Sequence, residues 1–265
     1  MGNITENDMA PQKDAFFRSK KKYNPINKED NFNVFNWSKW DLDIRIPSDT
    51  HDNDFASFQN FPQNIYIRDG ILFILPKLLT EMQGFNENRI RRGTLDLGTN
   101  CTGKHFDCRR VAHSFNILPP IVSSRITTKN HFSFKYGKIQ IKAKLPKGDW
   151  LFPQLFLEPL NNYYGDYDYE SGQIRLAFIR GNEKSAKYWN NSENNMAPFD
   201  QKFYLSFGVS AGGLSDFPDS CIDKPWKNYD PKNELKFWQA KDDWYPTWRG
   251  EDTALKIDYV RVWSL

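Results

Sequence analysis

The chain has 265 residues and a mass of 31.2 kDa, which suits one large domain or two small ones. Its 36 Lys and Arg against 33 Asp and Glu leave a formal charge of +3, too balanced for a nucleic-acid-binding face or a polybasic membrane patch. No apolar run approaches the roughly 18 residues of a membrane span. Aromatic residues make up 16% and include nine Trp. Such enrichment favours β-structure and also supplies flat surfaces for ligands with apolar faces, such as sugars and bases.

The predicted elements are mostly strands. Residues 1–34 are rich in Lys, Asn and Asp and predict a polar leader or linker, followed by one domain over residues 35–265. Short apolar runs between turn residues predict strands at 65–67, 71–75, 132–134, 138–145, 174–179, 203–209 and 255–263. Helices are expected near 233–240 and around 78–82. The pattern predicts an all-β fold, an antiparallel β-sandwich.

Cysteine spacing and sequons carry further expectations. Cys101 and Cys108 enclose a short polar loop and predict a local disulfide. Zinc bound by Cys101, His105 and Cys108 is the alternative, but it lacks a convincing fourth ligand, so neither a metal nor a cofactor is expected. Cys221 is left over. Glycosylation sequons start at Asn3, Asn36, Asn100 and Asn190, of which the last three are the predicted acceptors. The N-terminal residues show no signal peptide.

Several blocks follow one another in the order of a known family. They are SKW, IRDGILFI, GTLDLGTNCTG, ITTKNHFSFKYGKIQIKAKLPKGDWLFP, SGQIRLAFIRGN, MAPFDQKFYLSFGVSAGG and EDTALKIDYVRVW. Together they resemble the insect β-1,3-glucan recognition proteins, also called Gram-negative-bacteria-binding proteins, of the glycoside hydrolase family 16 superfamily. The resemblance covers nearly all of residues 35–265. It implies a sandwich of the jelly-roll type, which is concanavalin A-like and laminarinase-like.

The strand at SGQIRLAFIRGN decides what chemistry the resemblance implies. Active members of the superfamily carry E-I-D-I-x-E there, because a retaining glycosidase needs two carboxyl groups about 5–5.5 Å apart. Residues i and i+2 share a strand face, and i+5 rejoins that face when one extra residue bulges out. Here Gln173, Arg175 and Phe178 stand at the nucleophile, middle and acid/base positions. None is acidic, so the resemblance implies a protein that is not an enzyme. Ile174 and Leu176 are expected to pack into the core.

A glycosidase cleft that has lost its acids can still bind sugar. The aromatic candidates are Trp150, Phe152, Phe156 and Tyr164, with Tyr163, Tyr167 and Tyr169 in the same loop; the polar candidates are Gln173, Arg175 and Arg125. Two alternatives stay open: Trp150 belongs to the core instead, and Arg175 forms an ion pair that fills the cleft. A third is residual endo-β-1,3-glucanase activity from displaced carboxylates, Glu158 or Glu170.

Residues 183–195 form a short polar bridge where the family has a longer segment with further strands. The expected product is a sandwich that lacks some strands and has an exposed edge, or else an aberrant gene product. The resemblance implies a secreted, non-catalytic pattern-recognition protein of innate immunity. Its partners would be β-1,3-glucan or a related microbial polysaccharide and, in an immune cascade, serine proteases. A protein-interaction scaffold without sugar affinity is the remaining alternative.

Overall fold

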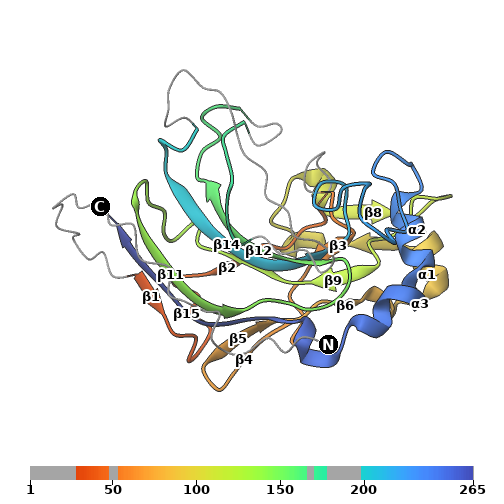
Figure 1. Ribbon diagram of the computed structural model, residues 1–265, viewed down its shortest axis with the longest axis horizontal. Coiled ribbons are helices and arrows are strands. Elements are labelled where there is room, and N and C mark those ends of the chain that lie inside the picture. The colour runs from red at the N-terminus through yellow and green to blue at the C-terminus, as the bar shows by residue number, and fades with distance from the viewer. Residues whose placement is uncertain (1–27, 48–52, 166–169, 178–197, 265) are drawn as a thin grey trace, which may run out of the picture.

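The computed structural model describes residues 28–47, 53–165, 170–177 and 198–264. The predicted features at Asn3, Tyr167, Tyr169, Phe178, Asn190 and the bridge 183–195 lie outside the described residues. Within the described residues, the helices are too short and too polar to cross a membrane. The fold consists mainly of two curled antiparallel sheets that face each other, with short helices gathered at one end (Figure 1).

The first sheet, sheet A, is built around the long strand β15 (Leu255–Ser264). Strand β11 (Gly137–Lys144) pairs along one edge of β15. Strands β1 (Lys28–Asp30) and β5 (Ile71–Ile74) pair along the other, and β4 (Ile65–Arg68) pairs with β5. The alternation of apolar and polar residues along β11 and β15 explains this placement, because it buries one face and leaves the other in water.

The second sheet, sheet B, has the strand order β13-β12-β14-β10-β2. These strands are β13 (Ile174–Ala177), β12 (Leu151–Pro159), β14 (Phe203–Ala211), β10 (Arg125–Thr127) and β2 (Asp41–Leu42). Strands β12 and β14 pair over nine residues without a register shift, so they form the stiff centre of the sheet.

Smaller elements complete the domain. The remaining strands are β3 (Ala56–Phe58), β6 (Lys77–Leu78), β7 (Thr94–Asp96), β8 (Arg109–Val111) and β9 (Ile121–Ser123). The helices are α1 (Glu87–Arg92), α2 (Asn233–Gln239) and α3 (Lys241–Trp244), and the 3₁₀ turns are η1 (Leu79–Glu81), η2 (Gly98–Asn100), η3 (His105–Asp107), η4 (Tyr245–Thr247) and η5 (Gly250–Thr253).

The main core lies between the two sheets. Leu155 and Leu157 of β12 and Phe207 of β14 come from sheet B, and Val260 and Val262 of β15 come from sheet A; all belong to one buried cluster. Burying such a side chain stabilises the fold by about 1.5–3 kcal/mol. Successive side chains of a strand point to opposite faces of the sheet. The strands of sheet B therefore turn one face to the core and hold polar side chains on the other.

Two sequence-based predictions need correction. Residues 132–134 do not form a strand; Phe134 makes only an isolated bridge to Phe203. The domain also begins before residue 35, since Lys28–Asp30 pair with β15 and Phe32 is fully buried. The polar composition of residues 1–34 concealed this edge strand, because a three-residue strand carries no visible periodicity.

The other predicted elements within the described residues are present. Strands occur at 65–68, 71–74, 137–144, 174–177, 203–211 and 255–264, and helical turns occur at 79–81 and 233–239. The antiparallel sandwich predicted from the sequence is therefore confirmed.

Candidate functional site

The polar side chains of sheet B gather on the face turned away from the core. Because Leu155 and Leu157 face the core, Gln154, Phe156 and Glu158 of β12 point the opposite way. Cross-strand neighbours share a face, so the register adds further residues. We call the whole set the polar face of sheet B; its members are Arg125, Gln154, Phe156, Glu158, Arg175, Tyr204 and Ser206.

Arg125 is the centre of a buried ionic network on this face. Its side chain is 3% exposed. The guanidinium forms an ion pair with Glu158 and donates from Nε to Ser206 Oγ at 2.7 Å. The same Nε lies 3.3 Å from the carboxylate of Asp43, which follows β2. Glu158, one of the two displaced carboxylates considered from the sequence, thus lies buried and paired in strand β12.

Burial and nearby charges shift the pKa values of two groups in this network. Burial opposes ionisation of Asp43, but Arg45 and Arg125 outweigh it and hold the pKa of that carboxyl below its ordinary value. Burial, followed by the negative charge of Glu158, raises the pKa of the Tyr204 phenol. Asp43 therefore stays ionised and Tyr204 stays neutral near pH 7.

Arg175 occupies the middle of β13. Its guanidinium forms an ion pair with Asp216, a residue of the loop that follows β14. Its Nε donates to Gln173 Oε1 at 3.0 Å, and its Cζ lies 5.2 Å from the ring centre of Phe156. Arg175 thus forms an ion pair, as one of the two sequence-based alternatives predicted.

Strand β13 contains a β-bulge, the irregularity that brings residues i and i+5 of a strand to the same face. Leu155 pairs with Ala177 and the next residue, Phe156, pairs with Arg175, so Leu176 is the extra residue of a bulge. Leu176 is 37% exposed, whereas Ile174 packs against the core. The prediction that Leu176 would also pack into the core is wrong, because the bulge turns it outward.

The loop that carries Asp216 is held by a buried lysine. The side chain of Lys224 is 1% exposed. Its ammonium donates to the carbonyl of Phe217 at 2.8 Å, to Asp219 at 2.7 Å and to the side chain of Asn228. Burial lowers the pKa of Lys224, against the opposing effect of Asp219. These three acceptors fix the loop and so fix the carboxylate that meets Arg175.

Three carboxylates of this region are thus each bound to a guanidinium: Asp43 and Glu158 to Arg125, and Asp216 to Arg175. Each of these contacts joins a carboxylate to a guanidinium that another strand or loop holds in place, so the three pairs cross-link neighbouring elements of the domain.

Three of the predicted aromatic platforms, Trp150, Phe152 and Phe156, are buried. Trp150 is 3% exposed and packs edge-on against Phe217 and Trp226, at centroid distances of 5.3 and 5.1 Å. Phe152 is 1% exposed and packs edge-on against Phe217. Trp150 therefore occupies the core position that the sequence left open as its alternative. Phe156 is 2% exposed beneath Arg175 and is not part of the main core cluster.

The two predicted loop tyrosines that the structure describes, Tyr163 and Tyr164, are both exposed. Tyr163 is 79% and Tyr164 is 42% exposed, in the turn before β13. The Tyr164 hydroxyl donates to Asp200, and this hydrogen bond raises the pKa of the phenol. The Tyr164 backbone N–H donates to Ser171 Oγ at 3.0 Å. Tyr164 is thus held at both ends while its ring stays accessible.

Sequence reasoning missed Asp43, Asp216, Tyr204 and Ser206. The alternation Asp41-Leu42-Asp43 signals a strand with acids on one face and could have indicated Asp43. No sequence pattern links Asp216 to Arg175, because they lie 41 residues apart and meet through the packing of a loop.

The cysteine predictions can be checked directly. Cys101 and Cys108 form a disulfide with Cα atoms 5.4 Å apart, so both sulfurs are unavailable to the alternative zinc site. Cys221 is buried and lies outside this disulfide. Of the predicted glycosylation sites, Asn36 is half-buried and Asn100 is exposed.

Solved structures with a similar fold include a glucanase. The non-specific endo-β-1,3(4)-glucanase SCLam of family GH16 has a TM-score of 0.54, with 15% identity over 92% of this chain and 97% of that chain. LamAcat from Zobellia galactanivorans has a TM-score of 0.51, with 16% identity over 89% of this chain and 96% of that chain. At this identity the likeness shows the fold alone. The chain therefore has the laminarinase-type jelly-roll fold.

Curated relatives identify the family. β-1,3-Glucan-binding protein 1 of Galleria mellonella is 32% identical, and Gram-negative bacteria-binding protein 1 of Drosophila melanogaster is 35% identical, each over 89% of this chain. The chain spans just under two thirds of these relatives, 63% and 64%. The β-1,3-glucan-binding protein of Penaeus monodon is 31% identical, with 89% of both chains covered. The chain belongs to the β-1,3-glucan-binding protein family. No family model matches it.

The matched region is longer in the Galleria relative than in this chain. The match to the Galleria relative extends over 316 positions, more than the 265 residues of this chain. That relative therefore has residues within the matched region that have no counterpart here. All three relatives are named for binding and not for hydrolysis.

Proposed function

We propose that this chain is a non-catalytic pattern-recognition protein that binds β-1,3-glucan or a related microbial polysaccharide in innate immunity. The observation that carries the proposal is the ion pair between Arg175 and Asp216 on β13. In the active members of the superfamily that the chain resembles, an acidic residue of the active site is expected at the strand position of Arg175. Here a guanidinium stands at that position, and Gln173 beside it has an amide in place of the carboxylate nucleophile. The names of the relatives support binding as the retained activity.

The proposed ligand contacts lie on β13 and in the loop that precedes it. Tyr163 and Tyr164 offer exposed rings, and a sugar ring can lay its apolar C–H face on them. Gln173 and the half-buried edge of Arg175 supply hydrogen-bond donors for hydroxyl groups. Trp150 and Phe152 contribute indirectly, because they support the loop that carries Asp216.

The cellular setting follows from the same proposal. The disulfide between Cys101 and Cys108 is typical of an oxidising compartment, which supports secretion. A secreted recognition protein would pass its signal on through protein contacts, and serine proteases of an immune cascade are the proposed partners. The shortened bridge at residues 183–195 is proposed to leave fewer strands than the relatives have.

Calorimetric titration with a β-1,3-glucan oligomer, beside a reducing-end assay with the same sugar, tests the proposal. We expect saturable binding without release of reducing ends. Tyr164→Ala should weaken binding, whereas Tyr229→Ala, at a 98% exposed tyrosine of another loop, should leave affinity unchanged.

Two outcomes would contradict the proposal. Reducing ends that are lost in Glu158→Gln would establish a glucanase. A flat titration with both β-1,3-glucan and β-1,4-glucan oligomers would favour a protein scaffold without sugar affinity.

A further inference from the structure

The loop between β1 and β2 exposes an apolar cluster. Val34 is 72% and Trp37 is 61% exposed, and the ring of Phe35 lies 4.4 Å from that of Trp37. We call these three residues the Trp37 cluster. Exposed aromatic rings that gather in one place usually have a partner with an apolar face.

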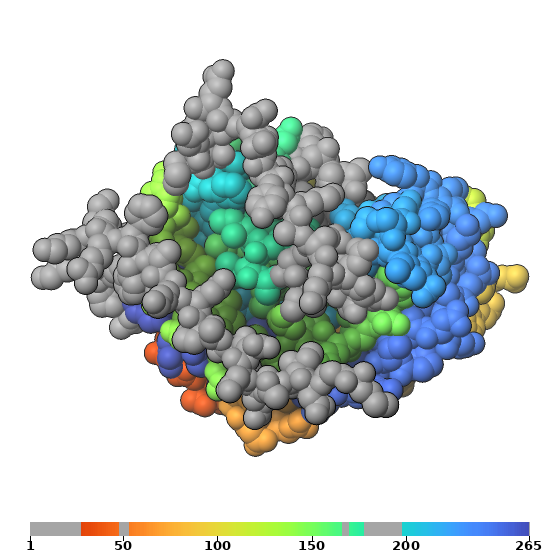
Figure 2. Space-filling model, in the orientation of Figure 1, coloured from red at the N-terminus to blue at the C-terminus, as the bar shows by residue number. Residues whose placement is uncertain are grey.

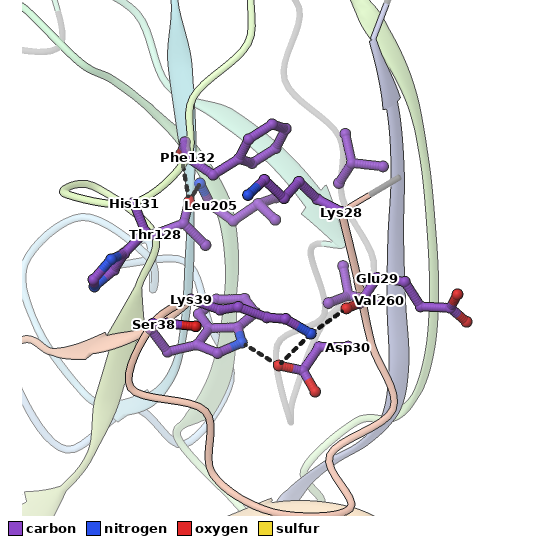
Figure 3. Close-up of a pocket in the computed structure, with 12 residues that line it drawn as sticks. Lys28, Glu29, Asp30, Ser38, Lys39, Thr128, His131, Phe132, Leu205 and Val260 are labelled. Atoms are coloured by element: carbon purple, nitrogen blue, oxygen red, sulfur yellow. Dashed lines mark hydrogen bonds and ion pairs between the residues drawn. The ribbon is translucent and has the colours of Figure 1, made fainter. Parts of the chain in front are cut away.

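The cluster is held in position from both sides. Phe32 and Trp40 are 0% and 2% exposed and anchor the two ends of the segment in the core. The ammonium of Lys39 donates to the carbonyl of Glu29 and lies 3.7 Å from the carboxylate of Asp30 (Figure 3). The exposure of Trp37 is therefore a property of a fixed turn and not of a loose segment.

The sequon Asn36-Trp37-Ser38 forms this turn. Asn36 Oδ1 accepts hydrogen bonds from the backbone N–H of Ser38 at 3.0 Å and from Ser38 Oγ at 2.7 Å. The Asn36 carbonyl accepts from the backbone N–H groups of Lys39 and Trp40 at 2.9 and 3.1 Å. Among the described residues, the Asn36 amide nitrogen Nδ2 has no hydrogen-bond partner. The nitrogen that would carry a sugar is thus left available.

We propose that Asn36 carries an N-linked oligosaccharide whose first N-acetylglucosamine units lie over the Trp37 cluster. In the transfer, Nδ2 loses a proton and bonds to C1 of the sugar, and the lipid pyrophosphate of the donor leaves. Sugar rings have apolar C–H faces that pack on aromatic rings, so one glycan would cover Val34, Phe35 and Trp37. The proposal rests on the secretion proposed above, because the donor belongs to the secretory pathway.

Asn100 provides the contrast. It is exposed at the end of η2, but its sequon passes through Cys101, which is in the disulfide. The sequon hydroxyl, Thr102 Oγ1, accepts from the backbone N–H of Ile44 at 2.9 Å and lies 3.0 Å from Asp43. This hydroxyl serves the fold and not its own sequon asparagine. Asn100 is therefore the matched control site.

The test uses the full chain secreted from insect cells behind a heterologous signal peptide, so that the natural route of export does not affect the result. Peptide mass spectrometry before and after endoglycosidase treatment locates the glycan. Acrylamide quenching of Trp fluorescence, measured before and after native deglycosylation, reports the accessibility of Trp37. Trp37→Phe identifies the contribution of that ring.

We expect Asn36 to be occupied and Trp fluorescence to become more quenchable after deglycosylation, with no such increase in Trp37→Phe. Asn36→Gln and Ser38→Ala should each lose one glycan, Ser38→Thr should keep it, and Asn100→Gln should keep the Asn36 glycan. An unmodified Asn36 in the secreted protein, or equal quenching before and after deglycosylation, would overturn the proposal. Glucan titration of the same samples reports separately on the proposed function, so the two failures are distinguishable.

Discussion

The guanidinium of Arg175 on β13 is ion-paired with the carboxylate of Asp216, which lies in the loop after β14. This pair joins the edge strand of sheet B to a loop that Lys224 holds rigid. The guanidinium also lies over the ring of Phe156 on the polar face of sheet B.

Breaking this pair should destabilise the protein. In Asp216→Asn the half-buried guanidinium of Arg175 loses its counter-charge, which costs about 1–3 kcal/mol. Urea denaturation measures the loss. Arg175→Met/Asp216→Asn should recover part of it, because the double variant leaves no unpaired charge. The matched control is Glu29→Gln in the exposed pair with Arg261, where we expect a much smaller change. Equal losses in the two single variants would contradict this account.

Arg125 should be more important for stability. Arg125→Met leaves the carboxylates of Asp43 and Glu158 without their shared partner in a buried site, and we expect a loss of about 3–5 kcal/mol. Thermal and urea denaturation check this value. Arg68→Met, in the exposed pair with Glu251, removes the same type of side chain at the surface and should have little effect. A stable Arg125→Met protein would show that the network is not required for the fold.

Glu234 should make stability depend on pH. Burial raises its pKa to about 7, against the opposing charge of Arg110 at 3.0 Å. Between the ordinary pKa of 4.5 and about 7, the folded state binds more protons at this carboxyl than the unfolded state does. Its contribution to stability is therefore full below pH 4.5 and is lost as the pH rises through 7.

The measurement compares urea midpoints of the wild type and Glu234→Gln across this range. The midpoint of the wild type should fall with rising pH relative to that of Glu234→Gln. A constant difference between the two proteins from pH 4.5 to 8 would contradict the prediction.

Trp150 should behave as a core residue. Trp150→Ala removes a side chain packed between Phe217 and Trp226 and should cost about 3–5 kcal/mol. Trp37→Ala, at a 61% exposed Trp, should change stability little. Denaturation of the two variants checks this contrast. If Trp150→Ala kept full stability but lost glucan affinity, Trp150 would be a binding platform after all.

Much of this protein could be predicted from its sequence. The alternation in 138–145 and 255–263 reflects one wet and one buried face, a local consequence of strand geometry, and β11 and β15 occur there. The sequence also shows directly that residues 173 and 175 are Gln and Arg and not acidic residues. The short spacing of Cys101 and Cys108 predicted their disulfide.

The roles of single side chains needed the tertiary structure. The sequence around Trp150 does not distinguish a Trp that stacks on sugar from one that fills the core. Its contacts with Phe217 and Trp226 show that it belongs to the core. Leu176 follows the apolar pattern of β13, yet the bulge turns it outward.

By itself, the sequence determined the sandwich class, the family resemblance and the absence of acids at Gln173 and Arg175, because these depend on local alternation and on residue identity. Only the tertiary structure decided which carboxylate meets which guanidinium. Arg125 and Glu158 lie 33 residues apart, and Arg175 and Asp216 lie 41 apart. Such pairs form through strand register and loop packing, which depend on the whole chain and leave no periodic trace in it.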